Sequence, residues 1–339
     1  MSELRVLQQT PGLRTAREAD ARRARRRRRA LLAALGVVLA VAALLLFMAQ
    51  GTSGPASVVF HRGRAGGSSA TASTPRTGYG AQLVVSSERV SPWFRWPPRS
   101  GLLFDVRTGG VLWEKNAQRV VAIASLTKIM TALVVVAHSR PSATALITPA
   151  ATHFSGSGVG LLPVWKRVSV RALLYGLLLP SGNDAAIALA QHVAGTRPRF
   201  IGMMNAEARR MGLRCTHFNS VSGIVDYENY SCATDLAIMA HAVLKQRLLA
   251  QIVATRSTAL PFPIKGGKLF LYNNNPLLVS PYPGADGVKT GYTAAAGRCL
   301  VATARRGSRW LGVVLLHSAD PPDQARRLLN AGFAKLATR

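Results

Sequence analysis

The chain has 339 residues, and its hydrophobic share of 48% is enough to bury the core of one large domain or two small ones. Its formal net charge of +29 is carried by 35 arginines and only 8 lysines. The sequence has no zinc-finger spacing, RNP-like aromatic run or helix-turn-helix pattern, so we expect no nucleic-acid partner. A basic surface that faces anionic membrane or wall polymers fits the charge equally well. Because the chain uses arginine for most of its positive charges, a lysine at a given position suggests that lysine itself is needed there.

The first 49 residues have the pattern of a membrane anchor. Residues 1–29 form an arginine-rich tail, and residues 30–49 carry no charge over about 20 positions, enough to cross the hydrocarbon core as a helix. Arginines before the apolar run place the N-terminus in the cytoplasm and the rest of the chain outside. A cleaved signal peptide is the alternative, but the run is long for one and no clear Ala-x-Ala site closes it.

The next segment, residues 50–91, is rich in Gly, Ser, Thr, Ala and Pro. Such a composition buries too little apolar surface to fold alone, so we predict a flexible linker. Periodic hydrophobic patterns begin near residue 92 and continue to the end of the chain without another linker. We therefore predict one folded, extracytoplasmic domain over residues 92–339.

Hydrophobic periodicity predicts the elements of this domain. The predicted strands are 101–106, 111–114, 287–292, 298–304 and 310–316, and the first two form a hairpin across a glycine-containing turn. The predicted helices are one that begins near Ser125, then 170–179, 184–193, 201–211 and 323–336. Strands at both ends of the domain with helices between them indicate an α/β (α+β) fold, with an antiparallel sheet formed by both ends and flanked by a helical subdomain.

Three cysteines, Cys215, Cys232 and Cys299, are too few and too irregularly spaced for a disulfide framework or a metal site. We expect them to be small buried hydrophobic residues. Whether Cys215 and Cys232 pair is left open.

The first motif with chemical meaning is Ser125-Leu-Thr-Lys128. Residues three apart share a helix face, so Lys128 is expected one turn from Ser125. Serine needs a neighbouring base to become a nucleophile, and a buried lysine near other cations has a lowered pKa and can be that base. Arginine cannot. We assign Ser125 as nucleophile and Lys128 as base; a capping serine before an exposed lysine is the alternative for an isolated match.

The second motif, Ser181-Gly-Asn183, lies between two predicted helices. A short loop there can project a hydroxyl and an amide into a cleft, so Ser181 is expected to relay a proton to the leaving group and Asn183 to hold the substrate backbone. The alternative is a plain turn, because serine and asparagine are common before a helix.

The third motif, Lys289-Thr-Gly291, lies on a predicted strand. Gly291 allows a peptide to approach the strand, Lys289 supplies a fixed positive charge, and the Thr290 hydroxyl is a second donor for a terminal carboxylate. The backbone N–H groups of Ser125 and Tyr292 are candidates for an oxyanion hole. A β-turn with a solvated lysine is the alternative.

With these three motifs in this order, the sequence resembles the low-molecular-mass penicillin-binding proteins, specifically the D-alanyl-D-alanine carboxypeptidase family of serine peptidases. The likeness runs from near Gly101 to the C-terminus and includes the stretches 124–133, 177–186, 204–208 and 286–297. It implies a serine β-lactamase/DD-peptidase-like fold. It also implies a peptidoglycan stem peptide as substrate, β-lactams as inhibitors, and no metal or organic cofactor.

The resemblance implies roles for the matching residues: Ser125 as acyl-enzyme nucleophile, Lys128 as proton acceptor, Ser181 in proton transfer, and Lys289 with Thr290 in binding the terminal carboxylate. The chain departs from the family at two places. It has Ser220-Val-Ser-Gly-Ile where many members have Asn-x-x-Gly-Leu or His-Gly-Leu, and it lacks the arginine that many members carry after the last strand.

Three other functions remain as alternatives. A DD-endopeptidase uses the same constellation. A class A β-lactamase needs a glutamate between the second and third motifs, where only Glu207 and Glu228 occur, the first within a helix pattern and the second without the expected loop. A non-catalytic wall-binding protein would not need the intact motifs. The stem-peptide chemistry and the oligomeric state are left open.

Overall fold

The computed structural model describes residues 83–337. The predicted tail, the predicted membrane segment and most of the predicted linker lie outside the described residues. Within 83–337 no single helix is long and apolar enough to cross a membrane; one pair bent by 104°, Ala233–Lys245 with Arg247–Ala254, passes that test by length and composition alone.

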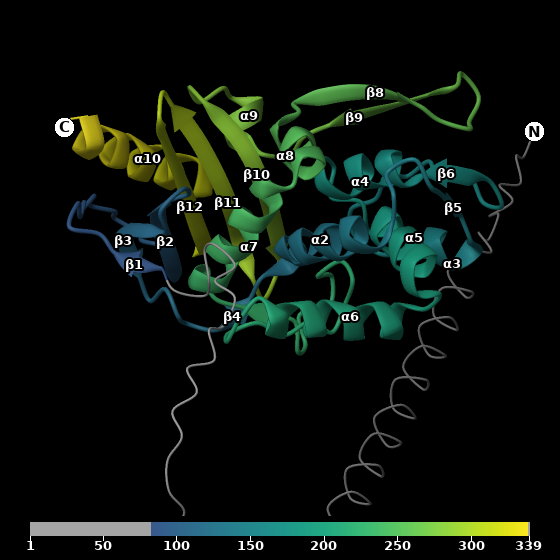
Figure 1. Cartoon of the computed structure of the whole chain (residues 1–339), viewed down its shortest axis with the longest axis horizontal. Coiled ribbons are helices and arrows are strands. Elements are labelled where there is room, and N and C mark those ends of the chain that lie inside the picture. Colours follow the sequence, from purple (N-terminus) through teal and green to yellow (C-terminus); the bar gives the residue numbers. More distant parts are fainter. Residues whose placement is uncertain (1–82, 338–339) are drawn as a thin grey trace, which may run out of the picture. The chain divides into compact units, whose positions relative to one another are not determined.

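A six-stranded sheet with the order β1-β3-β2-β12-β11-β10 forms the centre of the domain (Figure 1). All neighbouring strands are antiparallel except β1 and β3, which are parallel. Its strands are β1 (Val84–Val85), β2 (Ser100–Asp105), β3 (Gly110–Lys115), β10 (Ala285–Thr293), β11 (Gly297–Arg306) and β12 (Arg309–Ser318). The pairing of β2 with β12 joins the two ends of the domain, so the predicted fold class is confirmed.

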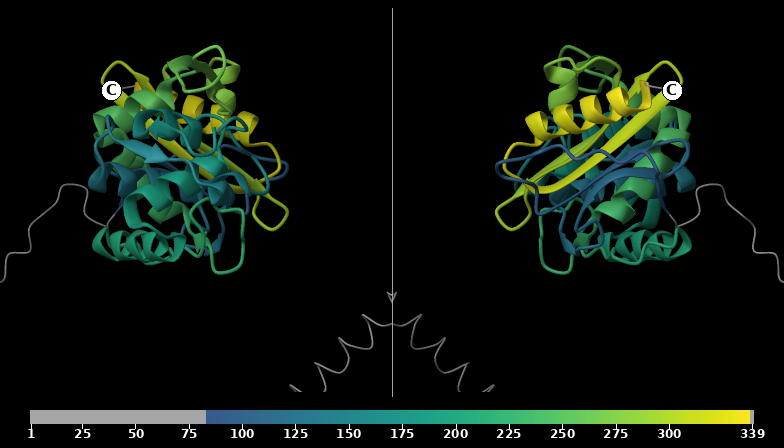
Figure 2. Two further views of the ribbon diagram at one scale, coloured as in Figure 1. Left: turned by 90° about the vertical axis from the view of Figure 1, so that its right-hand side faces the viewer. Right: turned by 90° about the vertical axis from the view of Figure 1, so that its left-hand side faces the viewer.

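The central strand β2 is buried on both faces. Its successive side chains point to opposite faces of the sheet, and they pack into two separate parts of the core. Leu102 and Phe104 pack into the large cluster on the helical side of the sheet, whereas Leu103 packs into a second cluster with Leu328 and Leu329 of the C-terminal helix. Figure 2 shows that helix, α10, lying across the sheet strands. The sheet is thus the middle layer, with α10 and the short helix α9 on one side and the larger helical cluster on the other.

Helices and small ribbons make up the rest of the domain. The helical elements are the 3₁₀ turn η1 (Ala124–Thr127) and helices α2 (Lys128–His138), α3 (Pro149–Thr152), α4 (Val170–Leu178), α5 (Asn183–Ala194), α6 (Arg197–Arg210), α7 (Ala233–Lys245), α8 (Arg247–Ala254), α9 (Pro276–Val279) and α10 (Pro321–Ala337). The ribbons pair β4 (Val121–Ala122) with β7 (Tyr230–Ser231), β5 (Thr144–Leu146) with β6 (Arg167–Ser169), and β8 (Ser257–Pro261) with β9 (Lys268–Tyr272).

Helix α6 begins four residues before the predicted start at 201. Thr196 caps it, with its side chain accepting from the backbone N–H of Arg199, and Pro198 lies in the first turn. Both are ordinary helix-start signals that the apolar periodicity alone does not include. The cap, not the first apolar residue, sets the beginning of the helix.

The folded part begins before residue 92, so the predicted end of the linker is too late. Strand β1 pairs with β3, and the backbone N–H of Val90 donates to the carbonyl of Leu112 at 2.9 Å. Phe94 then packs edge-on against Trp113, with ring centroids 6.0 Å apart. Backbone pairing at the sheet edge orders this stretch despite its polar composition.

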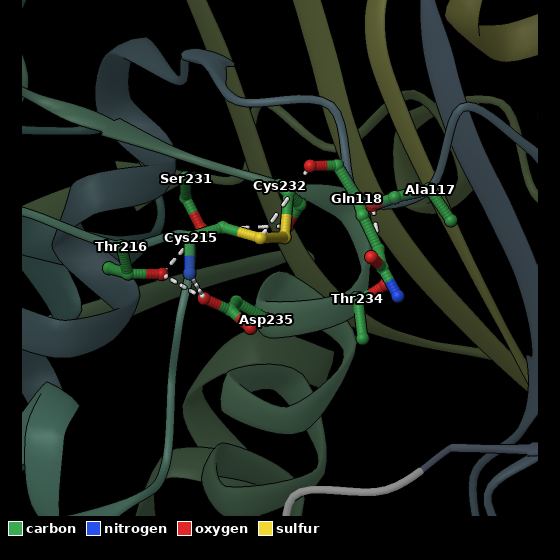
Figure 3. The surroundings of a disulfide bond; sticks show 8 residues. All are labelled: Ala117, Gln118, Cys215, Thr216, Ser231, Cys232, Thr234 and Asp235. Carbon is green, nitrogen blue, oxygen red and sulfur yellow. Dashed lines mark hydrogen bonds between the residues drawn. A yellow bond between two sulfur atoms is a disulfide. The ribbon is translucent and has the colours of Figure 1, made fainter.

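The cysteines behave differently from the expectation that all three are buried hydrophobic residues. Cys215 and Cys232 form a disulfide, with Cα atoms 5.5 Å apart (Figure 3). Only Cys299 is a buried free thiol among the described residues. The separation of 17 residues in the sequence did not predict this pairing, because it is the fold of the intervening loop that brings the two cysteines together.

Candidate active site

Ser125 and Lys128 lie together where the η1 turn leads into α2. The Nζ of Lys128 donates to the Oγ of Ser125 at 2.9 Å, which confirms the contact expected from their spacing. Lys128 is fully buried, whereas Ser125 is only partly buried. A substrate can therefore reach the hydroxyl while the amine behind it stays out of water.

Two further acceptors hold the Lys128 amine. Its Nζ donates to the Oδ1 of Asn183 at 2.7 Å and to the backbone carbonyl of Ser222 at 2.8 Å. With Ser125 these make three partners, the full number that an ammonium group can satisfy. The geometry fixes the amine toward the serine hydroxyl.

The pKa of Lys128 lies well below its ordinary value. Burial is the largest cause, because desolvation disfavours the charged amine. The nearby charge of Lys289 lowers the pKa further, and Asp184 opposes both effects. A lowered pKa increases the share of neutral amine, and only a neutral amine is able to accept a proton from a neighbouring hydroxyl.

Ser181 lies in the tight connection between α4 and α5, with a left-handed backbone (φ 68°). Its side chain is 5% exposed, and its Oγ has no hydrogen-bond partner within residues 83–337. A buried hydroxyl without a partner is unusual in a folded protein. This hydroxyl has the free donor and acceptor capacity that a proton relay needs.

Asn183 contacts the lysine of the first motif and also lines the pocket beside it, and its expected role of holding the substrate stays a prediction. Its Oδ1 accepts from Lys128, and its Nδ2 donates to the carbonyl of Ser155 at 2.6 Å. Both ends of the amide are engaged with the protein. Asn183 thus orients the lysine and ties it to the 155–160 segment, whose Val159 and Gly160 N–H groups in turn donate to Asp184.

The third motif faces the serine from strand β10. Lys289 is fully buried, and its Nζ donates to the carbonyl of Thr290 at 2.9 Å. Burial lowers its pKa to about 7. The charge of Lys289 is therefore conditional near neutral pH, not fixed as the sequence suggested.

Gly291 lies directly against η1. A Cβ at this position would be 3.0 Å from the Ile123 carbonyl and 3.1 Å from the Ser125 amide nitrogen. The glycine thus allows β10 to approach the nucleophile closely. Tyr292 follows with a side chain that is 69% exposed, so it is available at the rim of the site. The oxyanion hole formed by the Ser125 and Tyr292 N–H groups stays a prediction.

The segment 216–231 contributes residues that motif analysis did not assign. The carbonyl of Ser222 binds Lys128, and Gly223 has a left-handed backbone (φ 77°) at a place where a Cβ would be 1.9 Å from the Ala124 carbonyl. Backbone acceptors leave no signature in side-chain motifs. The one sequence feature that could have indicated this contact is Gly223, which lies in the stretch Ser220-Val-Ser-Gly-Ile that differs from the family pattern.

A pocket of about 830 Å³ adjoins the catalytic lysine. Asn183 and Ser222, the two fixed partners of Lys128, form part of its wall. The remaining wall is mostly apolar, with Phe154, Ile187, Pro198, Ile201, Val221, Ile224 and Val225.

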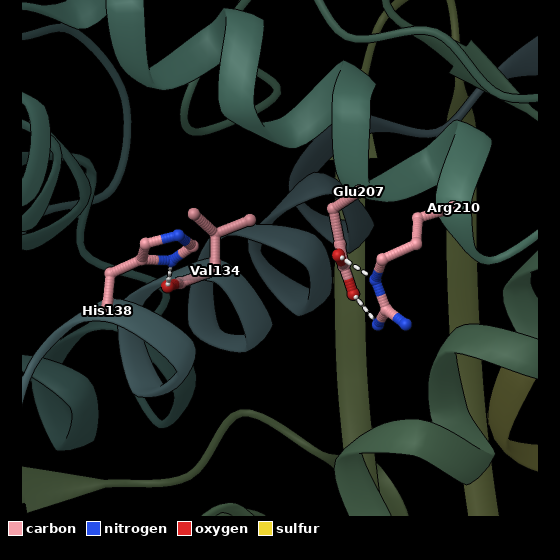
Figure 4. Close-up of polar contacts among 4 residues, drawn as sticks. All are labelled: Val134, His138, Glu207 and Arg210. Atoms are coloured by element: carbon pink, nitrogen blue, oxygen red, sulfur yellow. Dashed lines mark hydrogen bonds and ion pairs between the residues drawn. The ribbon is translucent and has the colours of Figure 1, made fainter. Parts of the chain in front are cut away.

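The two glutamates considered for a β-lactamase have other surroundings than Ser125 and Lys128. The Glu207 carboxylate is held on α6 by two hydrogen bonds from Arg210, of 2.6 and 2.7 Å (Figure 4). Glu228 is exposed. Neither carboxylate forms a hydrogen bond with Ser125 or Lys128, whose contacts are with each other, Asn183 and Ser222.

The two lysines give stability a pH dependence. The pKa values of Lys128 and Lys289 are lower in the folded chain than the ordinary lysine value of 10.5, which applies in the unfolded chain. Between about pH 7 and pH 10.5 the unfolded chain therefore binds more protons than the folded chain. The free energy of unfolding must then rise as pH increases from about 7 to 9, by up to about 1.4 kcal/mol per pH unit for Lys289. Above pH 9 Cys299 opposes the rise, because burial raises its pKa to about 11.

Urea unfolding of the full chain at pH 7, 8 and 9 measures this slope. Lys289→Met removes one titrating group and keeps an unbranched side chain. Its free energy of unfolding should therefore rise less steeply with pH, by the contribution of one proton, about 1.4 kcal/mol per pH unit. Equal slopes in the two proteins would show that Lys289 does not titrate in this range.

The fold and the site place a serine hydroxyl against a buried lysine amine whose pKa is lowered, a pairing typical of the class of serine acyl-transfer enzymes with a lysine base. The chain belongs to the D-alanyl-D-alanine carboxypeptidase family, whose family model matches residues 94–319.

Individual relatives agree with this assignment. The chain is 34% identical to D-alanyl-D-alanine carboxypeptidase DacF of Bacillus subtilis over 71% of its own length and 63% of that protein, so it spans slightly less than two thirds of this relative. It is 38% identical to the D-alanyl-D-alanine carboxypeptidase of Streptomyces sp. K15, over 67% of its own length and 84% of that protein. The crystal structure of the Streptomyces K15 DD-transpeptidase superposes with a TM-score of 0.68 at 36% identity, covering 72% of this chain and all of that chain.

Proposed function

We propose that this protein is a serine D-Ala-D-Ala carboxypeptidase that removes the terminal D-Ala from peptidoglycan stem peptides. The observation that carries the proposal is the 2.9 Å contact between the Lys128 amine and the Ser125 hydroxyl, with burial and Lys289 lowering the pKa of the amine. Family membership over residues 94–319 supports the choice of substrate.

The reaction has two steps. Neutral Lys128 takes the proton of Ser125 as the Oγ bonds to the carbonyl carbon of the penultimate D-Ala, and the C–N bond to the terminal D-Ala breaks. The leaving amine receives a proton, for which the unpartnered Ser181 hydroxyl is the proposed relay. Water then hydrolyses the ester, releasing the shortened peptide and restoring Ser125. The chemistry needs only the side chains of the protein.

Release of free D-Ala from a pentapeptide ending in D-Ala-D-Ala tests the proposal. The full chain in detergent should release one D-Ala per peptide and produce a tetrapeptide of matching mass. The proposal would be contradicted if the wild-type chain released D-Ala no faster than a Ser125→Ala preparation does. A cross-linked dimer as substrate tests for a DD-endopeptidase, and benzylpenicillin turnover tests for a β-lactamase.

Transpeptidation is a second candidate, because the Streptomyces K15 structure that this chain resembles is that of a DD-transpeptidase. Both reactions share the Ser125 acyl-enzyme and differ in the acceptor, water or an amine. Adding glycylglycine to the pentapeptide assay separates them. A carboxypeptidase gives tetrapeptide as the main product, whereas a transpeptidase gives the glycylglycine adduct.

We also propose that the domain acts outside the membrane, anchored by residues 30–49 with the N-terminus in the cytoplasm. The uncharged run behind an arginine cluster supports the anchor. The Cys215–Cys232 disulfide supports an oxidising compartment. Protease added to intact cells should remove the domain, and a domain protected until the membrane is opened would contradict this location.

A further inference from the structure

The disulfide closes a loop, residues 216–231, that reaches the catalytic lysine. At its base, Cys215 N and Thr216 Oγ1 both donate to the Asp235 carboxylate at 2.7 Å, and Cys232 directly precedes α7 (Figure 3). The two strands of the loop also meet at a bridge between His217 and Tyr230. The disulfide therefore joins two ends that lead directly into the loop.

The loop binds the helix that carries Ser125 and Lys128 at successive points. The Ser222 carbonyl accepts from Lys128 at 2.8 Å, and the preceding carbonyl, of Val221, accepts from Thr131 at 2.7 Å. The Asn229 amide donates to Thr127 Oγ1 at 2.7 Å. One loop thus holds three residues, Thr127, Lys128 and Thr131, where η1 passes into the first turn of α2.

The same loop reaches both sides of the nucleophile. Its last residue, Ser231, pairs with Val121, four residues before Ser125. Near its tip, Asp226 accepts from Thr293 Oγ1 of β10 at 2.7 Å. The loop therefore connects the strand of the third motif with the helix of the first.

We propose that the Cys215–Cys232 disulfide is a positioning element for the general base: by closing the 216–231 loop it keeps the Ser222 carbonyl on Lys128 and water away from the amine. This inference rests on the proposed function. It assigns a catalytic consequence to two cysteines that contact neither Ser125 nor Lys128.

The physical reason is that loops open locally at lower cost than whole domains unfold. The loop holds Lys128 and Thr131 of α2 through hydrogen bonds to two of its backbone carbonyls, and water can take the place of these carbonyls when the loop moves. A covalent closure at the base restricts the conformations that the open loop can adopt. Catalytic groups need positions held within about 0.5 Å, so even partial opening reduces the reaction rate.

Loss of the closure should change the titration of Lys128 in a defined direction. The charged groups that act on its amine are Lys289 of β10 and Asp184 of α5, and both lie outside the loop. Opening the loop leaves these charges in place and admits water, which removes part of the desolvation. The pKa of Lys128 then rises, so the neutral base is reached only at higher pH.

The pH profile of kcat/KM for D-Ala release tests the proposal. The full chain is compared with the double variant Cys215→Ser/Cys232→Ser, and rates are normalised to active sites by penicillin titration so that unfolded protein does not count. The acid limb of the variant should shift to higher pH by about one unit. Its rate should then be about tenfold lower on the acid limb and approach wild type at alkaline pH.

Two further measurements make the test independent of the folding of the variant. Wild type treated with reductant should show the same shift, and reoxidation should reverse it. Cys299→Ala should respond to reductant as wild type does, because its disulfide is intact. A loss equal at all pH values, or no change on reduction, would overturn the proposal. Absence of D-Ala release by the oxidised wild type would instead contradict the proposed function.

Discussion

Replacing Ser125 with alanine should abolish D-Ala release, with kcat/KM falling roughly 10⁴-fold or more, the scale seen when a serine nucleophile is removed from its triad. The Oγ of Ser125 is the atom to which the Lys128 amine donates at 2.9 Å, so the change removes the nucleophile itself. Steady-state assays on the pentapeptide measure the effect.

The fold should survive this change, because Ser125 is partly exposed and its neighbours Ala124 and Leu126 supply the buried contacts of η1. Ser308→Ala, at an exposed serine in the β11–β12 turn, is the matched control and should retain activity within about twofold. Activity of Ser125→Ala above about 1% of wild type would identify a different nucleophile.

Replacing Lys128 with arginine should reduce acylation about 10³-fold or more. Arginine keeps the positive charge but does not lose its proton in proteins, so it cannot accept the proton of Ser125. The larger guanidinium must also fit a fully buried position, where the Lys128 amine now contacts Ser125, Asn183 and the Ser222 carbonyl. Stopped-flow measurement of the rate of penicillin acylation isolates this step from deacylation.

Lys265→Arg makes the same chemical change at an exposed position between β8 and β9, and its acylation rate should stay within about twofold of wild type. If Lys128→Arg acylates as fast as this control, the lysine supplies only charge. The account of Lys128 as base would then be wrong.

The short-range parts of the site were predictable from the sequence. The spacing of Ser125 and Lys128 on one helix fixed their contact, and alternation of apolar residues located β2, β10, β11 and β12. These features depend on neighbours within one element, so local patterns determine them. A sheet joining both ends of the domain was predictable because the strands expected from the sequence lie only near those ends; the short ribbons β4 to β9 between them were not predicted.

The long-range parts were not predictable. The Ser222 carbonyl binds a lysine 94 residues earlier, and this partner is a backbone atom common to every residue type. Asn183 was assigned to the substrate alone, and its contacts with Lys128 and Ser155 were not foreseen. Local sequence does not show which of several polar groups in a folded site satisfy one another.

Burial likewise changed the interpretation of Lys289. Its position on a strand and its charge were readable from the sequence, but its complete burial was not. Burial lowers its pKa to about 7, and its charge in turn lowers the pKa of Lys128. The third motif therefore acts on the base of the first motif, besides its expected role toward a substrate carboxylate.

Mass mapping of a penicillin adduct is the measurement that tests the Ser125 acyl-enzyme most directly. The full chain is incubated with a labelled penicillin, digested and analysed by tandem mass spectrometry. We predict one adduct per chain, located on Ser125 and absent from the Ser125→Ala variant. An adduct on another residue, or one that persists in Ser125→Ala, would contradict the assignment of Ser125 as the nucleophile.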